Sequence, residues 1–247
     1  MAVAVDFHSH ILPGIDDGCD CVDEAIALLQ MESDQGVRHV VLTPHFYANH
    51  DNLERYLTRR ENAERLLREE MKKYTGLPTL HLGAEVHFFT GMSESEQIAD
   101  LAISSTKHIL IEMPHPPWTE KMYRELERIY TKRGLTPIIA HVDRYISRFR
   151  TFQIPQRLEK LPVKIQANAE FFLSKNSSSM AMRMLRDGQI HLLGSDCHNA
   201  TTRKPNVGDA VKWIENRSGK AAIAPILEYE QTVLFGNESI LPTRMCE

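Results

Sequence analysis

Histidine and acidic residues that follow short apolar runs are the part of this chain best suited to chemistry. His8 and His10 follow the first such run, and Asp196 and His198 follow the last one with the same spacing. The residues that end the runs between them are His45, Glu85, Glu112 and His141. Imidazole nitrogens and carboxylate oxygens of this kind bind divalent metals when they meet in one place. The pattern therefore indicates a metal site, provided that the fold brings these positions together.

The apolar runs themselves indicate parallel strands. They are apolar almost without interruption, which is typical of strands buried on both faces of a sheet. They cover residues 3–8, 37–43, 79–85, 108–113, 137–142, 163–168 and 191–195. Helical patterns lie between several of them, at Asp23–Gln35, Asp51–Lys73, Thr119–Arg133 and Ser177–Asp187. Seven such units favour an α/β barrel of seven strands over the alternative, a doubly wound open sheet.

A barrel would explain why the candidate residues follow strands. The carboxyl ends of its strands meet at one mouth, where barrel enzymes carry out their chemistry. Side chains two residues apart on a strand point the same way, so each His-x-His or Asp-x-His pair can hold one ion. The histidines at the opposite strand ends, which should be packing or surface residues, are His39, His108 and His191. His87 lies just past a strand end, and spacing does not decide its role.

Composition excludes several classes of function. The net charge of −4 and the pI near 6.3 offer no bulk attraction to nucleic acid or to an anionic membrane. No apolar stretch approaches the roughly 20 residues of a membrane helix, and no signal peptide pattern is visible. The cysteines, which suggest no disulfide framework, are Cys19, Cys21, Cys197 and Cys246. We expect a cytoplasmic protein with one domain over residues 1–247 and no direct membrane insertion.

Several longer motifs support a resemblance to a known family. The first is Asp6-Phe-His8-Ser-His10, which Asp16-Asp17-Gly18 follows closely. The others are Thr43-Pro-His45, Gly83-Ala-Glu85, Leu110-Ile-Glu112, His141-Val-Asp-Arg144-Tyr145 and Ser195-Asp196-Cys-His198. With these motifs in this order, the chain resembles the polymerase-and-histidinol-phosphatase (PHP) superfamily. Within it, the chain is most similar to the capsule-locus tyrosine phosphatases of bacteria, the CpsB/CapC group.

The resemblance implies a distorted (β/α)7 barrel, similar to a TIM barrel, with three divalent ions at its mouth. The first ion would be held by His8, His10, Glu85 and Asp196, the second by Glu85, Glu112 and His141, and the third by Asp17, His45 and His198. Asp17 also fits a simple turn residue in Asp16-Asp17-Gly18. Carboxylate and imidazole donors without thiolate suit manganese or iron, and zinc is compatible. Family precedent favours Mn²⁺.

The chemistry that the resemblance implies is hydrolysis of phosphotyrosine. A metal lowers the pKa of bound water from about 15.7 towards 7, so a hydroxide that bridges two ions can attack phosphorus. Guanidinium groups match phosphate geometry, and the candidates are Arg144 and then Arg203. The implied substrate is a bacterial tyrosine kinase with a flexible, tyrosine-rich tail that controls capsule or exopolysaccharide synthesis. The aromatic residues that could contact the phenol ring are Phe46, Tyr47, Trp118 and Tyr145.

Other functions are compatible with parts of the sequence. The same metals could serve a small-molecule phosphatase, such as a histidinol-phosphate phosphatase, and a silent PHP module could bind a partner. Cys197 and Arg203 also match the Cys-x5-Arg signature of cysteine-dependent phosphatases, but no glycine lies between them to help the backbone curl around phosphate. The proline-rich stretch Met113–Trp118 could reshape the rim of the mouth. The last forty residues carry no motif, and the oligomeric state is open.

Overall fold

Parallel strands curl into a barrel in the computed structural model, which describes residues 4–149 and 153–236. The strands are β1 (Val5–Ser9), β2 (His39–Leu42), β3 (His45–Phe46), β4 (Thr79–Leu82), β5 (Glu85–His87), β6 (His108–Glu112), β7 (Thr136–Ile139), β8 (Lys164–Asn168) and β9 (Leu192–Gly194). They pair in the orders β1-β2-β4 and β3-β5-β6-β7-β8-β9. Because β3 continues β2 and β5 continues β4 after short breaks, they occupy the seven predicted strand positions.

The first and last strands, β1 and β9, meet, and this excludes the alternative of a doubly wound open sheet. Ser9 at the end of β1 forms a parallel bridge with Cys197 just beyond β9. The amide of His10 also donates a hydrogen bond to the carbonyl of Cys197, at 2.9 Å. The amide of Asp196 donates to the carbonyl of His8 in the same way. The first and last strands are therefore neighbours, and the barrel prediction is confirmed.

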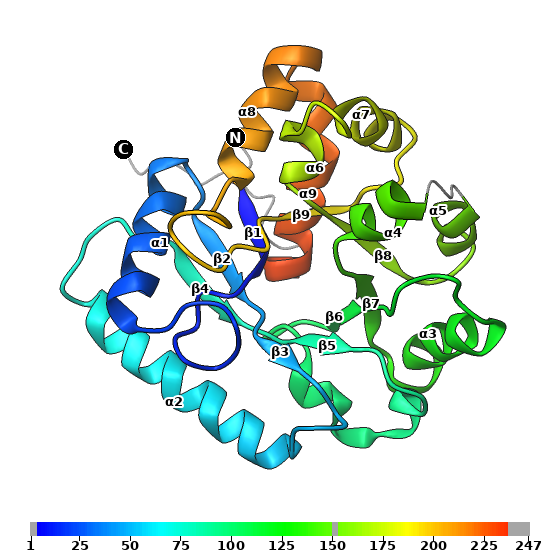
Figure 1. Cartoon of the computed structure of the whole chain (residues 1–247), viewed down its shortest axis with the longest axis horizontal. Coiled ribbons are helices and arrows are strands. Elements are labelled where there is room, and N and C mark those ends of the chain that lie inside the picture. Colours follow the sequence, from blue (N-terminus) through cyan, green and yellow to red (C-terminus); the bar gives the residue numbers. More distant parts are fainter. Residues whose placement is uncertain (1–3, 150–152, 237–247) are drawn as a thin grey trace, which may run out of the picture.

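Helices surround the strands, as Figure 1 shows. They are α1 (Val22–Asp34), α2 (Leu53–Met71), α3 (Glu120–Arg133), α4 (Val142–Phe149), α5 (Gln153–Leu158), α6 (Glu170–Leu173), α7 (Ser178–Arg186), α8 (Val207–Ser218) and α9 (Lys220–Phe235), with 3₁₀ turns η1 (Met92–Glu94) and η2 (Glu96–Leu101). The four predicted helices correspond to α1, α2, α3 and α7. Gly134, for example, ends α3 with a φ of 64°, a left-handed conformation that glycine adopts at low cost.

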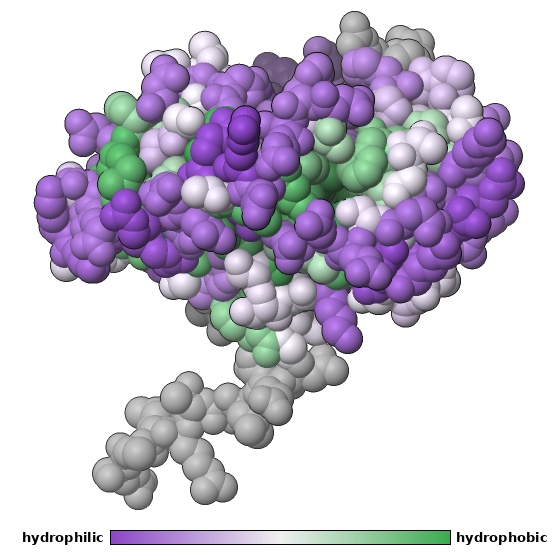
Figure 2. Space-filling model, turned by 90° about the horizontal axis from the view of Figure 1, so that it is seen from below, coloured by the Kyte–Doolittle hydropathy of each residue, from purple (hydrophilic) through white to green (hydrophobic). Residues whose placement is uncertain are grey.

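The outer surface of the molecule is largely hydrophilic. Helix α2 buries only one face, through Tyr56, Arg60, Ala63 and Leu67, and so is an outer helix of the barrel. In Figure 2 hydrophilic residues cover most of the visible face, while hydrophobic ones gather mainly in its hollowed centre. None of the described helices combines the length and the apolar character that a bilayer span requires.

Helix α9, which the sequence did not predict, closes the amino-terminal end of the barrel. Its residues Val233 and Leu234 join a buried cluster whose other members come from strands around the barrel and the loop before β6: Val5, Phe7, Val41, Ile103, Leu110, Ile138, Ala140 and Leu192. Because these strands lie on different sides of the barrel, the cluster must fill its interior. The histidines predicted to be packing residues contact α9 as well. His108 and His191 lie beside Tyr229, and His39 lies beside Phe235.

Glu230 of α9 is a buried acid whose ionisation should affect stability. Its Oε1 accepts a hydrogen bond from the amide of Leu193, and burial raises its pKa well above the ordinary value of 4.5. The folded chain therefore keeps the proton at pH values where the unfolded chain has lost it, so stability falls as the pH rises above 4.5.

The substitution Glu230→Gln keeps a carbonyl acceptor for Leu193 and removes the titration. We expect the variant to be more stable than the parent chain, by a difference that grows with pH. Urea unfolding at about pH 5 and about pH 8 would measure it. The exposed Glu228→Gln on the same helix is the control. A difference that is constant with pH would show that Glu230 is ionised in the folded state.

Candidate metal centre

Glu85, at the start of β5, lies at the centre of the predicted site. Its Oε2 is 3.2 Å from Nε2 of His8, 3.3 Å from Nε2 of His10 and 3.1 Å from Nδ1 of His45. Its Oε1 is 2.8 Å from Nε2 of His141. The side chain is 1% exposed. Burial would raise the pKa of Glu85, but the imidazoles of His8, His10 and His141 hold it well below the usual range. Four predicted residues therefore surround one buried carboxylate.

The remaining predicted residues lie around this centre. Glu112 is 3.6 Å from His141 through Oε1, and Asp196 is 3.5 Å from His10 and 3.7 Å from His8 through Oδ1. Burial would raise the pKa of Glu112, but hydrogen bonds to imidazoles lower it to about 2. The structure thus brings Glu112 and Asp196 next to the histidines around Glu85.

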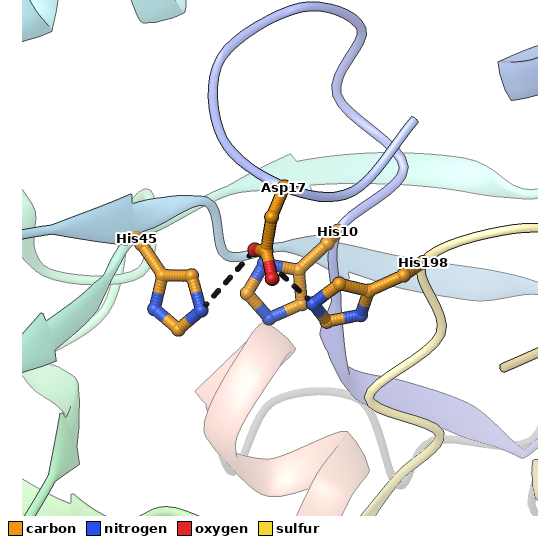
Figure 3. A group of neighbouring side chains, drawn as sticks. All are labelled: His10, Asp17, His45 and His198. Carbon is orange, nitrogen blue, oxygen red and sulfur yellow. Dashed lines mark ion pairs between the residues drawn. The ribbon is translucent and has the colours of Figure 1, made fainter. Parts of the chain in front are cut away.

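Figure 3 shows a second group, in which Asp17 lies between two imidazoles. Oδ1 of Asp17 is 3.6 Å from Nε2 of His45 and 3.4 Å from Nε2 of His198. The ring of His10 lies beside both of these histidine rings, with centroids 4.5 Å from His45 and 4.1 Å from His198. The Asp17 side chain is 67% exposed, so this group opens towards solvent. All nine predicted residues therefore belong to one continuous cluster.

Backbone strain marks two of these positions. His141 has a φ of 32° and Asp196 a φ of 54°, in a region that residues other than glycine rarely adopt. Strand β7 ends at Ile139, earlier than predicted, so His141 lies in the turn beyond it. Such strain persists where the surroundings hold the residue firmly, and it is common at functional sites.

Several polar residues that were not predicted orient the imidazoles. Oε1 of Gln166 accepts a hydrogen bond from the amide of His141 at 2.6 Å and lies 3.2 Å from Nδ1 of His8. Oδ2 of Asp16 is 2.7 Å from Nδ1 of His10 and accepts the amide of His45 at 2.9 Å. These oxygens are placed to accept the Nδ1 protons of His8 and His10, and in the neutral tautomer that they favour both Nε2 atoms face the site as acceptors.

The arrangement of the imidazoles fits a bound cation. Nε2 of His8 and Nε2 of His10 are only 3.1 Å apart. Without a cation, one of the two nitrogens must carry a proton to bridge this gap, whereas two unprotonated nitrogens about 2.1 Å from a common ion can lie this close together. His198 behaves similarly, because its Nδ1 contacts the carbonyl of Asp196 and its buried Nε2 has no hydrogen-bond partner among the described residues. The donor set therefore suits divalent metal ions.

The electrostatics of the cluster point the same way. Burial alone would lower the pKa of His10, but hydrogen bonds to Asp16 and Glu85 raise it to about 10. The surrounding carboxylates thus demand positive charge at the position of this ring. A bound cation would supply that charge and leave the imidazole neutral, as a ligand must be.

Both predicted arginines reach the edge of the site. Nη2 of Arg144 donates to Oδ2 of Asp196 at 2.5 Å, and Nη2 of Arg203 donates to its Oδ1 at 2.8 Å. Nη1 of Arg144 also lies 3.5 Å from Oε1 of Glu112. Their side chains are 38% and 40% exposed, so each retains donors that face solvent.

Cys197 does not have the surroundings of a catalytic nucleophile. Its side chain is buried in a separate group with Asp6 and Glu32, and burial raises its pKa well above the ordinary range. A reactive cysteine instead needs a lowered pKa and access to substrate. The other described cysteines, Cys19 and Cys21, are free thiols, and Cys246 lies outside the described residues.

The rim of the mouth contains one of the four predicted aromatic residues. Phe46, Trp118 and Tyr145 are buried in the core, so they are packing residues. Tyr47 remains partly exposed, with its ring 5.2 Å from that of His45 and 5.4 Å from that of His87. It lines a recess of about 270 Å³ whose other lining residues are Ala48, Asn49, His50, His87, Phe88 and Phe89. His87 itself joins the site, because its Nδ1 lies 3.1 Å from Oε2 of Glu112.

Comparison with known proteins identifies relatives along nearly the whole chain. A family model described as capsular polysaccharide synthesis, CpsB/CapC, matches residues 4–235. Tyrosine-protein phosphatase CpsB of Streptococcus agalactiae serotype III is 26% identical over 245 residues, which cover 93% of this chain and 98% of that protein. Tyrosine-protein phosphatase YwqE of Bacillus subtilis is 27% identical over 251 residues, which cover 96% of this chain and 93% of that protein.

A solved structure shares the fold. It comes from crystal structures of YwqE from Bacillus subtilis and CpsB from Streptococcus pneumoniae, described as unique metal-dependent tyrosine phosphatases. The match has a TM-score of 0.83 at 23% identity and covers 94% of both chains. At this identity the likeness establishes the barrel architecture.

Asp16 offers a test of the metal centre that leaves the candidate ligands intact. Asp16→Asn weakens the acceptor that orients His10, so we expect the affinity for Mn²⁺ to fall about 10- to 100-fold. Calorimetric titration of metal-free protein with Mn²⁺ would measure the change. Asp20→Asn, which removes an exposed charge from the same loop, is the control. Equal affinities for both variants would mean that Asp16 does not position a ligand.

Proposed function

The chain belongs to the CpsB/CapC capsular polysaccharide synthesis family, and from this we propose that it is a metal-dependent phosphatase that hydrolyses phosphotyrosine in proteins. The observation that carries the proposal is the position of two arginines at the edge of a buried imidazole and carboxylate cluster. Arg144 and Arg203 both contact Asp196 and keep donors towards solvent. Cationic donors next to a metal centre suit a phosphoryl group.

We assign the metal ligands as the family resemblance suggests, with three divalent ions that are most simply Mn²⁺. The proposed ligands are His8, His10, Asp17, His45, Glu85, Glu112, His141, Asp196 and His198. When bound, such ions polarise phosphoryl oxygens and lower the pKa of water, so that a nucleophile is available at neutral pH. The convergent Nε2 atoms of His8 and His10 and the buried Nε2 of His198 support this assignment.

The arginines have a separate role in this proposal. Each guanidinium carries five N–H donors in a planar fork, and Arg144 uses its contacts with Asp196 and Glu112 to stay in place. Its remaining donors would bind phosphoryl oxygens and neutralise charge that develops during the transfer. Arg203 would do the same from the other oxygen of Asp196, so that the phosphoryl group is held between the two side chains.

The recess beside Tyr47 supports an aromatic leaving group. Tyr47, Phe88 and Phe89 line a space next to Glu112 and His45, which are both candidate ligands. A phenol ring would pack there against aromatic faces while its phosphate reaches the cluster. The physiological substrate in this proposal is a tyrosine-phosphorylated bacterial kinase of capsule or exopolysaccharide synthesis.

Hydrolysis of a phosphotyrosine peptide tests the proposed activity directly. We expect a chelator to abolish turnover and Mn²⁺ to restore it, because the ions supply the nucleophile. Cys197→Ser should keep its activity, since the thiol is buried outside the cluster. The measurement is phosphate release from purified protein. Turnover that survives chelation but disappears in Cys197→Ser would contradict the proposal.

The role of Tyr47 can be tested by comparing leaving groups. We expect Tyr47→Ala to lower kcat/KM for aryl phosphates about five-fold, because ring packing of this kind is worth about 1 kcal/mol. The value for alkyl phosphates, such as phosphoserine, should change less than about two-fold. Tyr130→Ala, at an exposed tyrosine on α3, is the matched control. Equal losses for aryl and alkyl esters would show that Tyr47 does not contact the ring.

A further inference from the structure

A groove of about 630 Å³ lies between α3 and the segment after β5. Its lining residues are Phe88, Thr90, Pro114, Thr119, Lys121, Met122, Arg124, Glu125 and Arg128. Three of them are cationic, and they project from successive turns of α3. The groove is more than twice as large as the recess at Tyr47, for which the volume is about 270 Å³. It is therefore large enough for several residues of a peptide.

The charges in this groove are only partly balanced by the described residues. Lys121 and Arg124 are exposed and form no close ion pair with a carboxylate of residues 4–149 or 153–236, although Arg124 acts on Glu120 at longer range and helps to lower its pKa. Arg128 has a loose pair with Glu94 at 3.7 Å. The one acid in the lining, Glu125, is buried and accepts the amide of Ser93 at 2.8 Å. A chain with a net charge of −4 thus presents a groove with unpaired positive charge.

The charge of Lys121 lies at an unfavourable position in α3. It lies in the first turn of α3, where the helix dipole favours acidic side chains and disfavours cations. The acid beside it, Glu120, pairs instead with Arg157. Lys121 therefore has no close carboxylate partner in the first turn of α3 to offset the unfavourable interaction of its charge with the helix dipole. An anion from outside the chain would be a suitable partner.

The groove is continuous with the candidate metal centre. Helix α3 follows β6, so its first turns lie at the mouth of the barrel. Phe88 lines both the groove and the recess at Tyr47, and its amide donates to the carbonyl of Glu112 at 2.9 Å. Pro114 follows Glu112 by two residues, and its carbonyl accepts Nε1 of Trp118 at 2.7 Å. Phe88 and Pro114 thus line the groove next to the candidate ligand Glu112.

We propose that this groove binds acidic residues that flank the phosphotyrosine of a peptide substrate. The inference rests on the proposed phosphatase function and adds a sequence preference to it. Unpaired cations supply charge complementarity to glutamate and aspartate side chains, while Phe88 and Met122 offer apolar surface to the peptide chain. The shared wall at Phe88 would let one peptide occupy the recess and the groove together.

Three substrates and two double variants test the preference. The substrates are free phosphotyrosine, a phosphotyrosyl peptide with acidic flanks, and the same peptide with each acid replaced by its amide. The groove variant is Lys121→Glu with Arg124→Glu. The control is Arg186→Glu with Lys212→Glu, which makes the same change in net charge at exposed positions of α7 and α8.

We expect the groove variant to lower kcat/KM for the acidic peptide about ten-fold or more, because two attractive pairs become repulsive. The amide peptide and free phosphotyrosine should change less than about two-fold, and the control variant should have little effect on any substrate. Equal losses for both peptides, or equal losses in the control variant, would overturn the proposal.

A binding measurement separates failure of the groove from failure of the proposed function. If the parent chain hydrolyses none of the three substrates with Mn²⁺, the phosphatase function is wrong. Fluorescence anisotropy of a labelled acidic peptide without phosphate then tests the groove by itself. Binding that is lost only in the groove variant supports it, and no binding by the parent chain overturns it.

Discussion

The constraint that governs this molecule is the burial of several carboxylates at one end of a barrel. Glu85 is 1% exposed and has three imidazole nitrogens within 3.3 Å of one oxygen. Buried charge of one sign is costly unless opposite charge lies close to it. The histidines, the two arginines on Asp196 and the left-handed backbone of His141 and Asp196 all serve to place positive charge or donors around these acids. The fold thus holds several carboxylates close together at a position that suits bound cations.

Much of the fold could be predicted because local pattern and tertiary role coincide. Continuous apolar runs mark strands that are buried on both sides, and α1, α2, α3 and α7 carry apolar residues at helical spacing. Helix α9 was missed because its buried residues do not follow the amphipathic pattern of an outer helix. It fills the barrel interior with Val233 and Leu234, buries the acid Glu230, and contains Pro225 near its start. A helix that closes the amino-terminal end of a barrel shows no simple periodicity of apolar residues.

The site was predictable where the type of a residue determines its role. It was less predictable where the role depends on which side chain the residue contacts in the folded chain. All nine predicted ligands lie in one cluster because each is near the carboxyl end of a strand position or in the loop that follows it, at the same end of the barrel. Asp16 and Asp17 are adjacent acids in one turn, yet the first is 6% exposed against His10 and the second 67% exposed. Only the folded chain separates the acid that supports an imidazole from the one that faces the opening. No sequence pattern indicates Gln166 either, because its role in orienting imidazoles depends on its contacts with His8 and His141.

The closure of the barrel also bears on how the chain is made. The bridge between Ser9 and Cys197 joins residues that lie far apart in the sequence, and Val233 and Leu234 of α9 pack in the interior against both early and late strands. During synthesis on a ribosome the early strands therefore emerge long before their partners. His8 and His10 are translated well before Asp196 and His198, so the cluster is complete only after the last strand has joined the first. Metal binding to the complete cluster would then follow closure of the barrel.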